Sequence, residues 1–490
     1  MQVLKFNQVI KSYLNKDIIT IEQLVISQNQ RIGIIGRNGQ GKSTLLNLLS
    51  GVIEPDRGEI QRSIDFQYYR QIAEVDEQGY EQMDPELLAR LQVPQHETKH
   101  FSGGEEARFR LAEIFSGYEM GLLLDEPTTH LDAEGVDFLI EELRYYYGTL
   151  VVVSHDRKLL NELVDTIWEV ENGNITVYEG NYNAYLEQKN LHRLEQQRAY
   201  EQFIKEKGRL EQAAQKKQEQ AQKMANVSKK QQKKNIKPNR LDSTKQKDTV
   251  QKAAHKTAKA IEKRMDQLQV VDPLQKEKNI QFPVAKELEL HNKFPIMGSD
   301  VTIQKGERLL LEKVDFQFPL GKRIGLVGPN GSGKSSLLQH ILESGEGVTL
   351  SPKVVFSLYK QMAYKFTKEK SLLEYLAEHS DYPEPTLRAI LSNLGFSQLE
   401  ITKSITKLSG GEATRLAIAK LFSTPSNVLI LDEPTNFIDL QTIAALETLM
   451  KHYPGTILFT SHDDYFMSQV AEQIWEISNQ NLRLKRGDHL

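Results

Sequence analysis

The stretch Gly36-Arg37-Asn38-Gly39-Gln40-Gly41-Lys42-Ser43 decides the fold, and its pattern returns as Gly328-Pro329-Asn330-Gly331-Ser332-Gly333-Lys334-Ser335. Both stretches fit G-x-x-x-x-G-K-[ST], the pattern of a loop that wraps phosphates. Each follows an apolar run typical of a buried strand, at 31–35 and 323–327, and precedes a run typical of a helix. This strand–loop–helix context indicates two nucleoside triphosphate sites.

The chemistry of such a loop assigns roles to its residues. Glycines let the backbone approach phosphates, and backbone N–H groups together with the helix N-terminus bind negative charge. We expect Lys42 and Lys334 to reach the β- and γ-phosphates, and Ser43 and Ser335 to ligate Mg²⁺. A glycine-rich turn without a ligand is the alternative, and the motifs downstream argue against it. The expected ATP-binding loop residues are Gly36, Asn38, Gly39, Gly41, Lys42, Ser43, Thr44, Gly328, Asn330, Gly331, Gly333, Lys334, Ser335 and Ser336.

The chain is an internal duplication. Four motifs occur twice, always 307 residues apart: Ser-Gly-Gly-Glu at 102 and 409, Asp-Glu-Pro-Thr at 125 and 432, Ser-His-Asp at 154 and 461, and Ile-Trp-Glu at 167 and 474. The loop lysines are 292 residues apart, so the second half has extra residues between its loop and its Ser-Gly-Gly. The same nucleotide-binding core therefore appears in both halves.

Two acidic pairs end apolar strands. Asp125 and Asp432 are expected to hold Mg²⁺, directly or through water. Glu126 and Glu433 come next and are candidates to polarise an attacking water. Strand-end surface charge is the alternative interpretation, and two preceding phosphate loops favour the catalytic one.

His155 and His462 each follow an apolar strand. A single histidine in this place is commonly structural, but its recurrence in both halves favours a sensor of the γ-phosphate. The Ser-Gly-Gly-Glu motifs stand before helical runs, where serine is first of all a capping residue. Their functional interpretation is a further anion site on N–H groups and a hydroxyl. The expected residues are Ser102, Gly103, Gly104, Glu105, Ser409, Gly410, Gly411 and Glu412.

Composition limits the remaining possibilities. The 490 residues include no cysteine, which excludes disulfides and thiol catalysis and is consistent with a cytoplasmic protein. No apolar run approaches the roughly 18–20 residues that span a bilayer. Residues 188–264 carry 22 Lys and Arg against 8 Asp and Glu, although the whole chain is net −4. This basic segment predicts a polyanionic partner, with a merely solvated linker as the alternative.

We predict an α/β protein with two tandem P-loop domains, at 1–187 and 286–490, joined by a basic helical linker at 188–285. Residues 185–227 lack proline and are rich in strong helix formers. Residues 226–248 contain Pro238 and should break the helix, and 252–270 return to a helical pattern. The linker is thus predicted to be an antiparallel helical hairpin with its tip at about 226–248, and a disordered tether is the alternative.

The order phosphate loop, glutamine, Ser-Gly-Gly, Asp-Glu-Pro-Thr, Ser-His-Asp resembles the ATP-binding-cassette (ABC) ATPases along nearly the whole chain. Two cassettes with a charged helical linker resemble the ABC-F proteins, which act on ribosomes. The chain is most similar to their antibiotic-resistance ribosome-protection group, the macrolide/streptogramin Msr/Vga-like proteins. The residues that carry this likeness are 145–149, 180–182, the Ala-Gln-Lys-rich helix, the loop 226–248 and the short spacing from Gln71 to Ser102.

The resemblance implies two head-to-tail composite ATP sites. One joins Lys42, Ser43, Gln71, Asp125, Glu126 and His155 to Ser409, Gly410, Gly411 and Glu412. The other joins Lys334, Ser335, Gln361, Asp432, Glu433 and His462 to Ser102, Gly103, Gly104 and Glu105. Gln71 and Gln361 assist Mg²⁺ binding in this scheme. Tyr13 resembles the aromatic residue that stacks on adenine, with a core strand tyrosine as the alternative, and the second half has no convincing counterpart.

Two departures from the family pattern could make the sites unequal. Phe101 replaces the leucine of the signature, and Thr129 stands where the second half keeps Asn436. Glu105 and Glu412 replace a transporter-type glutamine, which is ordinary in ABC-F members. Every catalytic residue type is present twice, so both sites are expected to hydrolyse ATP.

The resemblance also implies a function. ATP closes the cassettes of one monomer on each other, and the basic linker 188–264 enters the tRNA exit site of the bacterial ribosome. There it contacts large-subunit rRNA and P-site tRNA and displaces macrolide and streptogramin antibiotics, with lincosamides as a further class. The alternatives are a housekeeping ABC-F translation factor, the ATPase subunit of a drug exporter, a chromosome-maintenance ATPase and a non-catalytic RNA-binding scaffold.

Overall fold

The computed structural model divides into two compact units. One comprises Met1–Tyr185 together with Glu277–Leu490, and the other Leu186–Lys276. The first unit therefore contains both halves of the duplication. The domain boundaries 1–187, 188–285 and 286–490 stay a prediction. The structure describes residues 1–14, 16–70, 83–91, 93, 101, 103–117, 119–129, 131–233, 256, 260, 263, 282–283, 288–306, 308–359, 366, 369–436 and 438–487.

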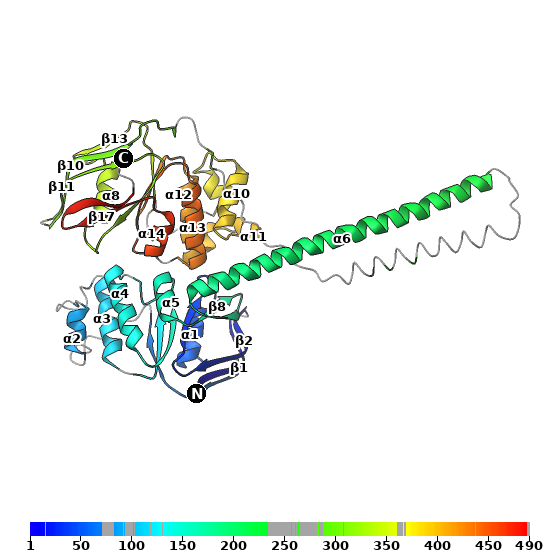
Figure 1. Ribbon diagram of the computed structural model, residues 1–490, viewed down its shortest axis with the longest axis horizontal. Helices are drawn as coiled ribbons and strands as arrows, with labels where there is room; N and C mark the ends of the chain where they lie inside the picture. Colours follow the sequence, from blue (N-terminus) through cyan, green and yellow to red (C-terminus); the bar gives the residue numbers. More distant parts are fainter. Residues whose placement is uncertain are drawn as a thin grey trace. The chain divides into compact units, whose positions relative to one another are not determined.

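The first half, cassette 1, is built on two sheets (Figure 1). An antiparallel sheet has the order β2-β1-β4, and a six-stranded sheet has the order β5-β6-β7-β3-β8-β9. In the larger sheet only β9 runs antiparallel to its neighbour. The strands are β1 (Gln2–Tyr13), β2 (Lys16–Ser27), β3 (Arg31–Ile35), β4 (Arg57–Arg62), β5 (Phe66–Tyr69), β6 (Gly121–Asp125), β7 (Thr149–Val153), β8 (Thr166–Glu171) and β9 (Asn174–Glu179).

Cassette 2 repeats this topology. Its sheets have the orders β11-β10-β13 and β14-β15-β16-β12-β17-β18. The central strands of both large sheets are continuous apolar runs, as expected for parallel strands covered on both faces. The strands are β10 (Ile296–Lys305), β11 (Arg308–Phe318), β12 (Arg323–Val327), β13 (Val348–Leu350), β14 (Phe356–Tyr359), β15 (Val428–Leu431), β16 (Thr456–Thr460), β17 (Gln473–Ser478) and β18 (Asn481–Arg486).

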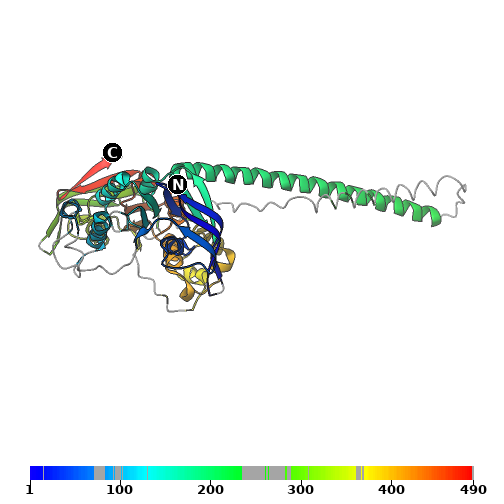
Figure 2. The same cartoon turned by 90° about the horizontal axis from the view of Figure 1, so that it is seen from below.

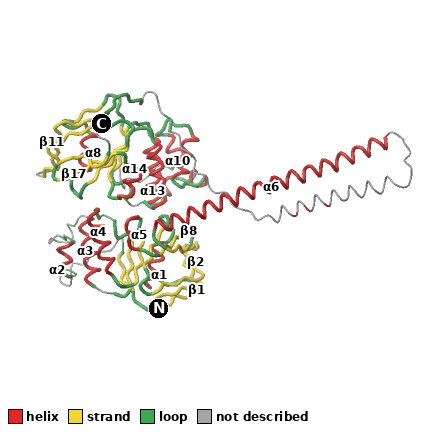
Figure 3. The backbone as a smooth tube through the Cα atoms, viewed as in Figure 1, coloured by secondary structure: helices red, strands yellow, loops and turns green. Residues whose placement is uncertain are grey.

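Helices accompany the strands of each cassette, red beside yellow in Figure 3. A core of buried aliphatic and aromatic side chains lies between the two sheets and the loop helix of each cassette. The helices of cassette 1 are α1 (Lys42–Ser50), α2 (Pro85–Arg90), α3 (Gly103–Ser116), α4 (Ala133–Tyr145) and α5 (Arg157–Leu163). Those of cassette 2 are α8 (Lys334–Leu342), α9 (Leu372–Ala377), α10 (Glu384–Asn393), α11 (Gln398–Ile401), α12 (Gly410–Ser423), α13 (Leu440–His452) and α14 (Asp464–Val470).

The first arm of the linker is one helix, α6 (Tyr182–Lys233), drawn without interruption in Figure 2. The predicted helix break at 226 is wrong in its position, because α6 continues to Lys233. Residues 226–233 contain neither proline nor glycine and are rich in lysine and glutamine, which favour helix. The remainder of the predicted tip and most of the second arm lie outside the described residues.

The start of α6 is tied to cassette 1 through a buried carboxylate. Glu169 on β8 accepts hydrogen bonds from the Tyr185 hydroxyl at 2.9 Å and the Tyr178 hydroxyl at 3.3 Å. The rings of the two tyrosines meet edge-on, 5.0 Å apart. The duplicated Ile-Trp-Glu motif thus anchors a helix in the first half.

We expect Tyr185→Phe to destabilise the protein by about 1–3 kcal/mol, because Glu169 would lose one of its donors while remaining buried. The urea midpoint of unfolding measures this change. Tyr145→Phe is the matched control, since Tyr145 is exposed. Equal midpoints for the two variants would contradict a stabilising role of the hydrogen bond.

Candidate functional site

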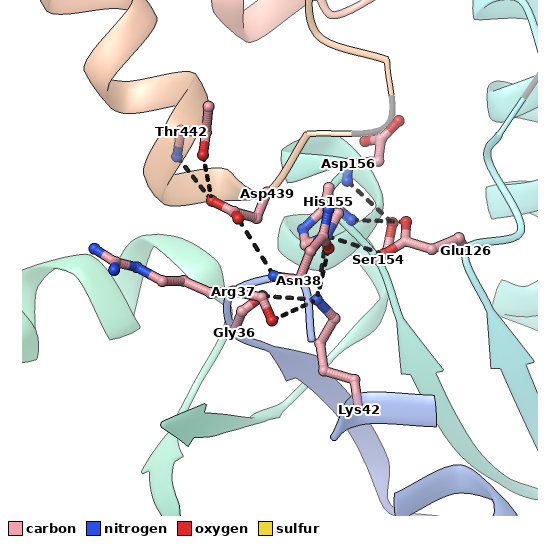
Figure 4. Close-up of polar contacts among 10 residues, drawn as sticks. All are labelled: Gly36, Arg37, Asn38, Lys42, Glu126, Ser154, His155, Asp156, Asp439 and Thr442. Carbon is pink, nitrogen blue, oxygen red and sulfur yellow. Dashed lines mark hydrogen bonds and ion pairs between the residues drawn. The ribbon is translucent and has the colours of Figure 1, made fainter. Parts of the chain in front are cut away.

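The first phosphate loop joins β3 to α1 in a backbone conformation that requires glycine. Gly36 has φ 149°, and a β-carbon built on it would lie 2.4 Å from the Val170 carbonyl oxygen. The Lys42 ammonium points back along the loop and donates to the Gly36 carbonyl at 2.7 Å and to Asn38 Oδ1 at 3.2 Å (Figure 4). The lysine is therefore held where a phosphate chain would enter the loop.

Carboxylates from β6 face this lysine. Asp125 ends the strand, and its Oδ2 accepts a hydrogen bond from the Tyr68 hydroxyl at 3.4 Å. Glu126 follows with φ 51°, a left-handed conformation that is unusual for a residue other than glycine. Its carboxylate accepts from the His155 backbone N–H at 3.2 Å and lies 3.3 Å from His155 Nε2. A strained backbone at an acidic residue is typical of a functional position.

Burial controls the protonation of these groups. It raises the pKa of Glu126 to about 8, with Asp125 adding to the rise and Lys42 opposing it. Burial, assisted by Lys42, lowers the pKa of His155 to about 3. The histidine is consequently neutral near pH 7 and can donate or accept a hydrogen bond without carrying charge. Pairs of groups with pKa values driven apart in this way are common in active sites.

The second site repeats this arrangement. Lys334 Nζ donates to the Gly328 carbonyl at 2.7 Å, and Gly328 has φ 151°. Glu433, with φ 46°, accepts from the His462 backbone N–H at 3.3 Å. Burial raises the pKa of Glu433 to about 7 and lowers that of His462 to about 4.

The two sites differ in the hydroxyl that positions the first carboxylate. In cassette 2 the donor is Thr460 on β16, whose Oγ1 lies 2.7 Å from Asp432 Oδ1. The duplicate of Thr460 is Val153, which has no hydroxyl, and cassette 1 uses Tyr68 on β5. Strand register pairs Tyr68 with Leu123 on β6 and Leu358 with Ile430 on β15, so Leu358 takes the place of Tyr68 in cassette 2. Among the described strands, each cassette thus supplies this carboxylate with a hydroxyl donor from a different strand.

Residues of cassette 2 lie against the first loop. The Asn38 backbone N–H donates to Asp439 Oδ2 at 3.3 Å (Figure 4). A β-carbon built on Gly411 would lie 3.3 Å from Asn38 Cβ, and Arg37 donates to the side chain of Gln441. In the other direction, the charge of Asp132 acts on both Lys334 and His462. The structure thus brings Gly411 to the first loop, as the composite arrangement requires.

A cavity of about 570 Å³ lies beside the first loop. This volume is within the roughly 300–1,000 Å³ usual for small-molecule sites. The cavity is lined by Tyr13, by the first phosphate loop, by Asp125 and Glu126, and by part of cassette 2. The lining residues relevant to the predictions are Tyr13, Asn38, Gly39, Gly41, Lys42, Ser43, Thr44, Asp125, Glu126, Thr129, His155, Asn436 and His462. Tyr13 is 48% exposed, which argues against a buried core role for its ring.

The structure places the other predicted residues as follows. Gln71, Gln361 and Ser102 lie outside the described residues, while Gly103, Gly104 and Glu105 form the first turn of α3. Ser409 is the N-cap of α12 and exchanges hydrogen bonds with Glu412 in a capping box. Thr129 and Asn436 make the same turn, donating to the carbonyls of Glu126 and Glu433. The replacement of asparagine by threonine therefore leaves the backbone unchanged.

Sequence reasoning missed three residues at the cassette contact. Asp132 and Asp439 cap α4 and α13. Arg37 occupies a position of the first loop at which the G-x-x-x-x-G-K-[ST] pattern specifies no residue. The two aspartates are 307 residues apart, like the recognised motifs. That offset could have identified them, whereas a helix cap alone suggests only local structure.

The donor set fits Mg²⁺ bound jointly with phosphates. Burial raises the pKa of Asp125 while the nearby Ser43 hydroxyl and Lys42 oppose the rise, so a hydroxyl and a carboxylate already lie together beside Lys42. Within the described part of the chain, no group of three or more histidine, cysteine or acidic residues is arranged to hold a metal. Mg²⁺ usually takes one or two protein ligands and completes its shell with phosphate and water.

We expect kcat/KM for ATP hydrolysis to rise with pH and to level off above about pH 8. A glutamate acting as base must be ionised, and burial places the pKa values of Glu433 and Glu126 at about 7 and 8. The two histidines, with pKa values of about 4 and 3, stay neutral throughout this range and cannot cause the rise. Steady-state hydrolysis at constant ionic strength from pH 6 to 9 tests this, and a flat profile would contradict it.

Comparison with known proteins agrees with this geometry. The family model described as ABC transporter matches residues 22–93 and 311–436. The chain is 46% identical over 480 residues to the erythromycin resistance ATP-binding protein MsrA of Staphylococcus epidermidis, covering 98% of each protein. It is 32% identical to the ribosome protection protein VmlR of Bacillus subtilis, covering 94% of this chain and 84% of that protein.

Among solved structures, the chain resembles that of an archaeal ribosome recycling factor, aABCE1, in complex with the ribosomal stalk protein aP1. The TM-score is 0.66 with 18% identity, covering 98% of this chain and 90% of the other. An identity this low supports the fold alone. In the portion of this protein that the structure describes, no helix is both long and apolar enough to cross a membrane.

Proposed function

The chain belongs to the ABC-F family of ATP-binding-cassette ATPases, in the group of the antibiotic-resistance proteins, and from this premise we propose that it protects bacterial ribosomes. It binds ATP between its two cassettes and hydrolyses it. In the ATP-bound state the basic linker enters the tRNA exit site, contacts large-subunit rRNA and P-site tRNA, and drives macrolides and streptogramins from their site. Lincosamides are a further class that this action would displace. The protein works as a cytoplasmic monomer whose cassettes pair within one chain.

One observation carries the ATP-dependent part of this proposal. Asn38 of the first loop contacts both Asp439 and Gly411 of cassette 2, so a nucleotide in that loop would touch both cassettes at once. ATP then favours the paired form because it makes contacts there that the separated form cannot offer. Without such a difference in affinity, binding could not drive any movement.

The residues of each site divide the chemistry among themselves. Lys42 and Lys334 bind the phosphates, and Ser43 with Asp125, and Ser335 with Asp432, hold Mg²⁺, which neutralises phosphate charge. Glu126 and Glu433 orient and deprotonate the attacking water, and neutral His155 and His462 contact the γ-phosphate. Tyr13 stacks on adenine in the first site. Hydrolysis removes the contacts that favour pairing and so releases the linker.

The ribosomal part rests on the linker and on the relatives. Residues 188–264 are strongly basic, which suits phosphate-rich RNA and makes binding weaker as salt rises. A relative named for erythromycin resistance matches 98% of the chain, and one named for ribosome protection matches 94%. Both matches extend across the linker as well as the cassettes.

Co-sedimentation with ribosomes tests the proposal. The Glu126→Gln/Glu433→Gln variant is incubated with ATP, ribosomes and radiolabelled erythromycin over a series of salt concentrations, and the bound drug is counted. We expect ATP-dependent binding that weakens with salt, together with loss of the drug. Binding with the drug retained would indicate a housekeeping translation factor or another drug class. The absence of binding at low salt would refute the ribosomal function and direct the search to a membrane partner.

A further inference from the structure

Arg157 is a deeply buried arginine whose role the catalytic scheme does not explain. It follows Ser154-His155-Asp156 and begins α5, which Asp156 caps by accepting from the Leu159 N–H. Arg157 is only 3% exposed. Arginine is rarely buried to this degree unless it is paired, so its partners indicate what it does.

Two of these partners belong to cassette 2. Arg157 Nη1 lies 2.6 Å from Glu447 Oε1 on α13, and both side chains are shielded from solvent. The guanidinium also lies over the ring of Tyr465 on α14, 4.7 Å from its centroid. Both interactions exist only while the two cassettes are paired.

The third partner is the first residue of α6. The Arg157 guanidinium lies close enough to the Tyr182 hydroxyl for each group to affect the pKa of the other, and the Tyr182 side chain is itself buried. The Tyr182 ring lies 5.7 Å from that of Tyr185, which is bonded to Glu169. The Arg157 guanidinium therefore lies between Glu447 and Tyr465 of cassette 2 and Tyr182, the first residue of α6. Cassette 1 anchors this end of α6.

The duplicate position does not repeat this arrangement. The residue 307 positions after Arg157 is Asp464, which begins α14 and cannot make these contacts. The duplicate of Glu169 is Glu476, which is half-exposed and pairs with Lys485 at 2.8 Å. The connection is thus specific to the half of the protein that continues into the long linker helix.

We propose that Arg157 is a positioning residue that couples pairing of the cassettes to the orientation of α6. Separation of the cassettes removes Glu447 and Tyr465, which cover the guanidinium, and exposes Arg157 to water. A guanidinium that water can solvate no longer has to stay beside Tyr182, so the tyrosine at the start of α6 loses a neighbour that fixes its position. Because α6 is continuous from Tyr182 to Lys233, a change in its first turn alters the direction of the whole arm. This inference rests on the proposed function only in assuming that ATP drives pairing.

Distance measurements without ribosomes test the inference. The chain has no cysteine, so two introduced cysteines can carry spin labels without competing sites. In the Glu126→Gln/Glu433→Gln background, Glu141→Cys with Lys451→Cys reports pairing of the cassettes. Gln202→Cys with Glu141→Cys reports the position of α6 against cassette 1, independently of pairing. All three labelled positions are exposed.

With Arg157 intact, ATP should shift both distance distributions. In Arg157→Met we expect the pairing distance to respond as before, whereas the ATP-induced population of the α6 distance falls about tenfold or more. Tyr182→Phe, which keeps the ring and removes only the hydroxyl, should weaken the α6 response in the same direction. Lys158→Met is the matched control, because Lys158 lies beside Arg157 but pairs with Asp137 of its own cassette.

Three outcomes would overturn the inference. The α6 distance could respond normally in Arg157→Met, or both distances could stop responding together, which would make Arg157 a simple interface contact. An equal loss in Lys158→Met would show that disturbance of α5 is sufficient. None of these measurements involves ribosomes, so a failure of ribosome protection leaves them interpretable.

Discussion

Replacing Glu126 and Glu433 together by glutamine lowers the rate of ATP hydrolysis by about 10²–10⁴-fold while ATP binding is retained. Glutamine keeps the size and the hydrogen-bonding shape of the side chain but cannot accept a proton from water. Each glutamate accepts a backbone N–H from the following histidine motif, at 3.2 and 3.3 Å, and a glutamine oxygen can accept the same bond. The geometry should therefore survive and only the chemistry should fail.

Single-turnover hydrolysis and equilibrium binding of ATP separate these two effects. Glu141→Gln is the matched control, because Glu141 is an exposed glutamate on α4 of the same cassette. We expect its rate to equal that of the unaltered protein. A residual rate within tenfold of normal in the double variant would mean that another group activates the water. A parallel loss of ATP binding would mean that the two glutamates are needed to bind ATP and not only to hydrolyse it.

Replacing Gly411 by valine lowers hydrolysis by about 100-fold or more, because it prevents close pairing of the cassettes. A β-carbon at this position would lie 3.3 Å from Asn38 Cβ, and the branches of valine would extend further toward the first loop. Asn38 belongs to the opposite cassette, so a change in cassette 2 should impair chemistry whose catalytic residues lie in cassette 1.

The measurement is hydrolysis together with the spin-label distance between the cassettes. Thr414→Val is the matched control, since Thr414 lies one turn further along α12, is half-buried, and changes only by losing its hydrogen bond to the Gly410 carbonyl. That variant gains no bulk toward Asn38 and should pair normally with ATP. Normal hydrolysis by Gly411→Val would contradict the composite site. Normal pairing with reduced hydrolysis would instead assign Gly411 a role in phosphate binding alone.

The strongest sequence predictions concerned segments whose function depends on local backbone geometry. The phosphate loops could be recognised because positive φ at Gly36 and Gly328 admits few other residues, and the neighbouring lysine and serine follow at fixed spacing. The paired aspartate and glutamate could be recognised because they end buried strands. In both cases the residues that act together are close in the sequence, so a short sequence motif is enough to recognise them.

Other features could not be predicted in this way. The end of α6 was misplaced because a lysine- and glutamine-rich stretch is compatible with both helix and loop, and no local residue enforces a break before Pro238. Tyr68 and Thr460 were missed because each donates to a carboxylate on another strand. Arg157 was missed because it is not duplicated: the residue 307 positions later is aspartate.

By itself, the sequence determined that this protein has two ATP-binding-cassette domains and that a basic segment joins the halves, and it predicted which residues bind phosphate. These properties depend on short motifs, on hydrophobic periodicity and on charge, all of which are local. Only the tertiary structure decided that Asp439 and Gly411 meet Asn38, and that Arg157 contacts Glu447, Tyr465 and Tyr182. Except for the one between Arg157 and Tyr182, these contacts join residues hundreds of positions apart, and they arise only when packing brings the two cassettes together.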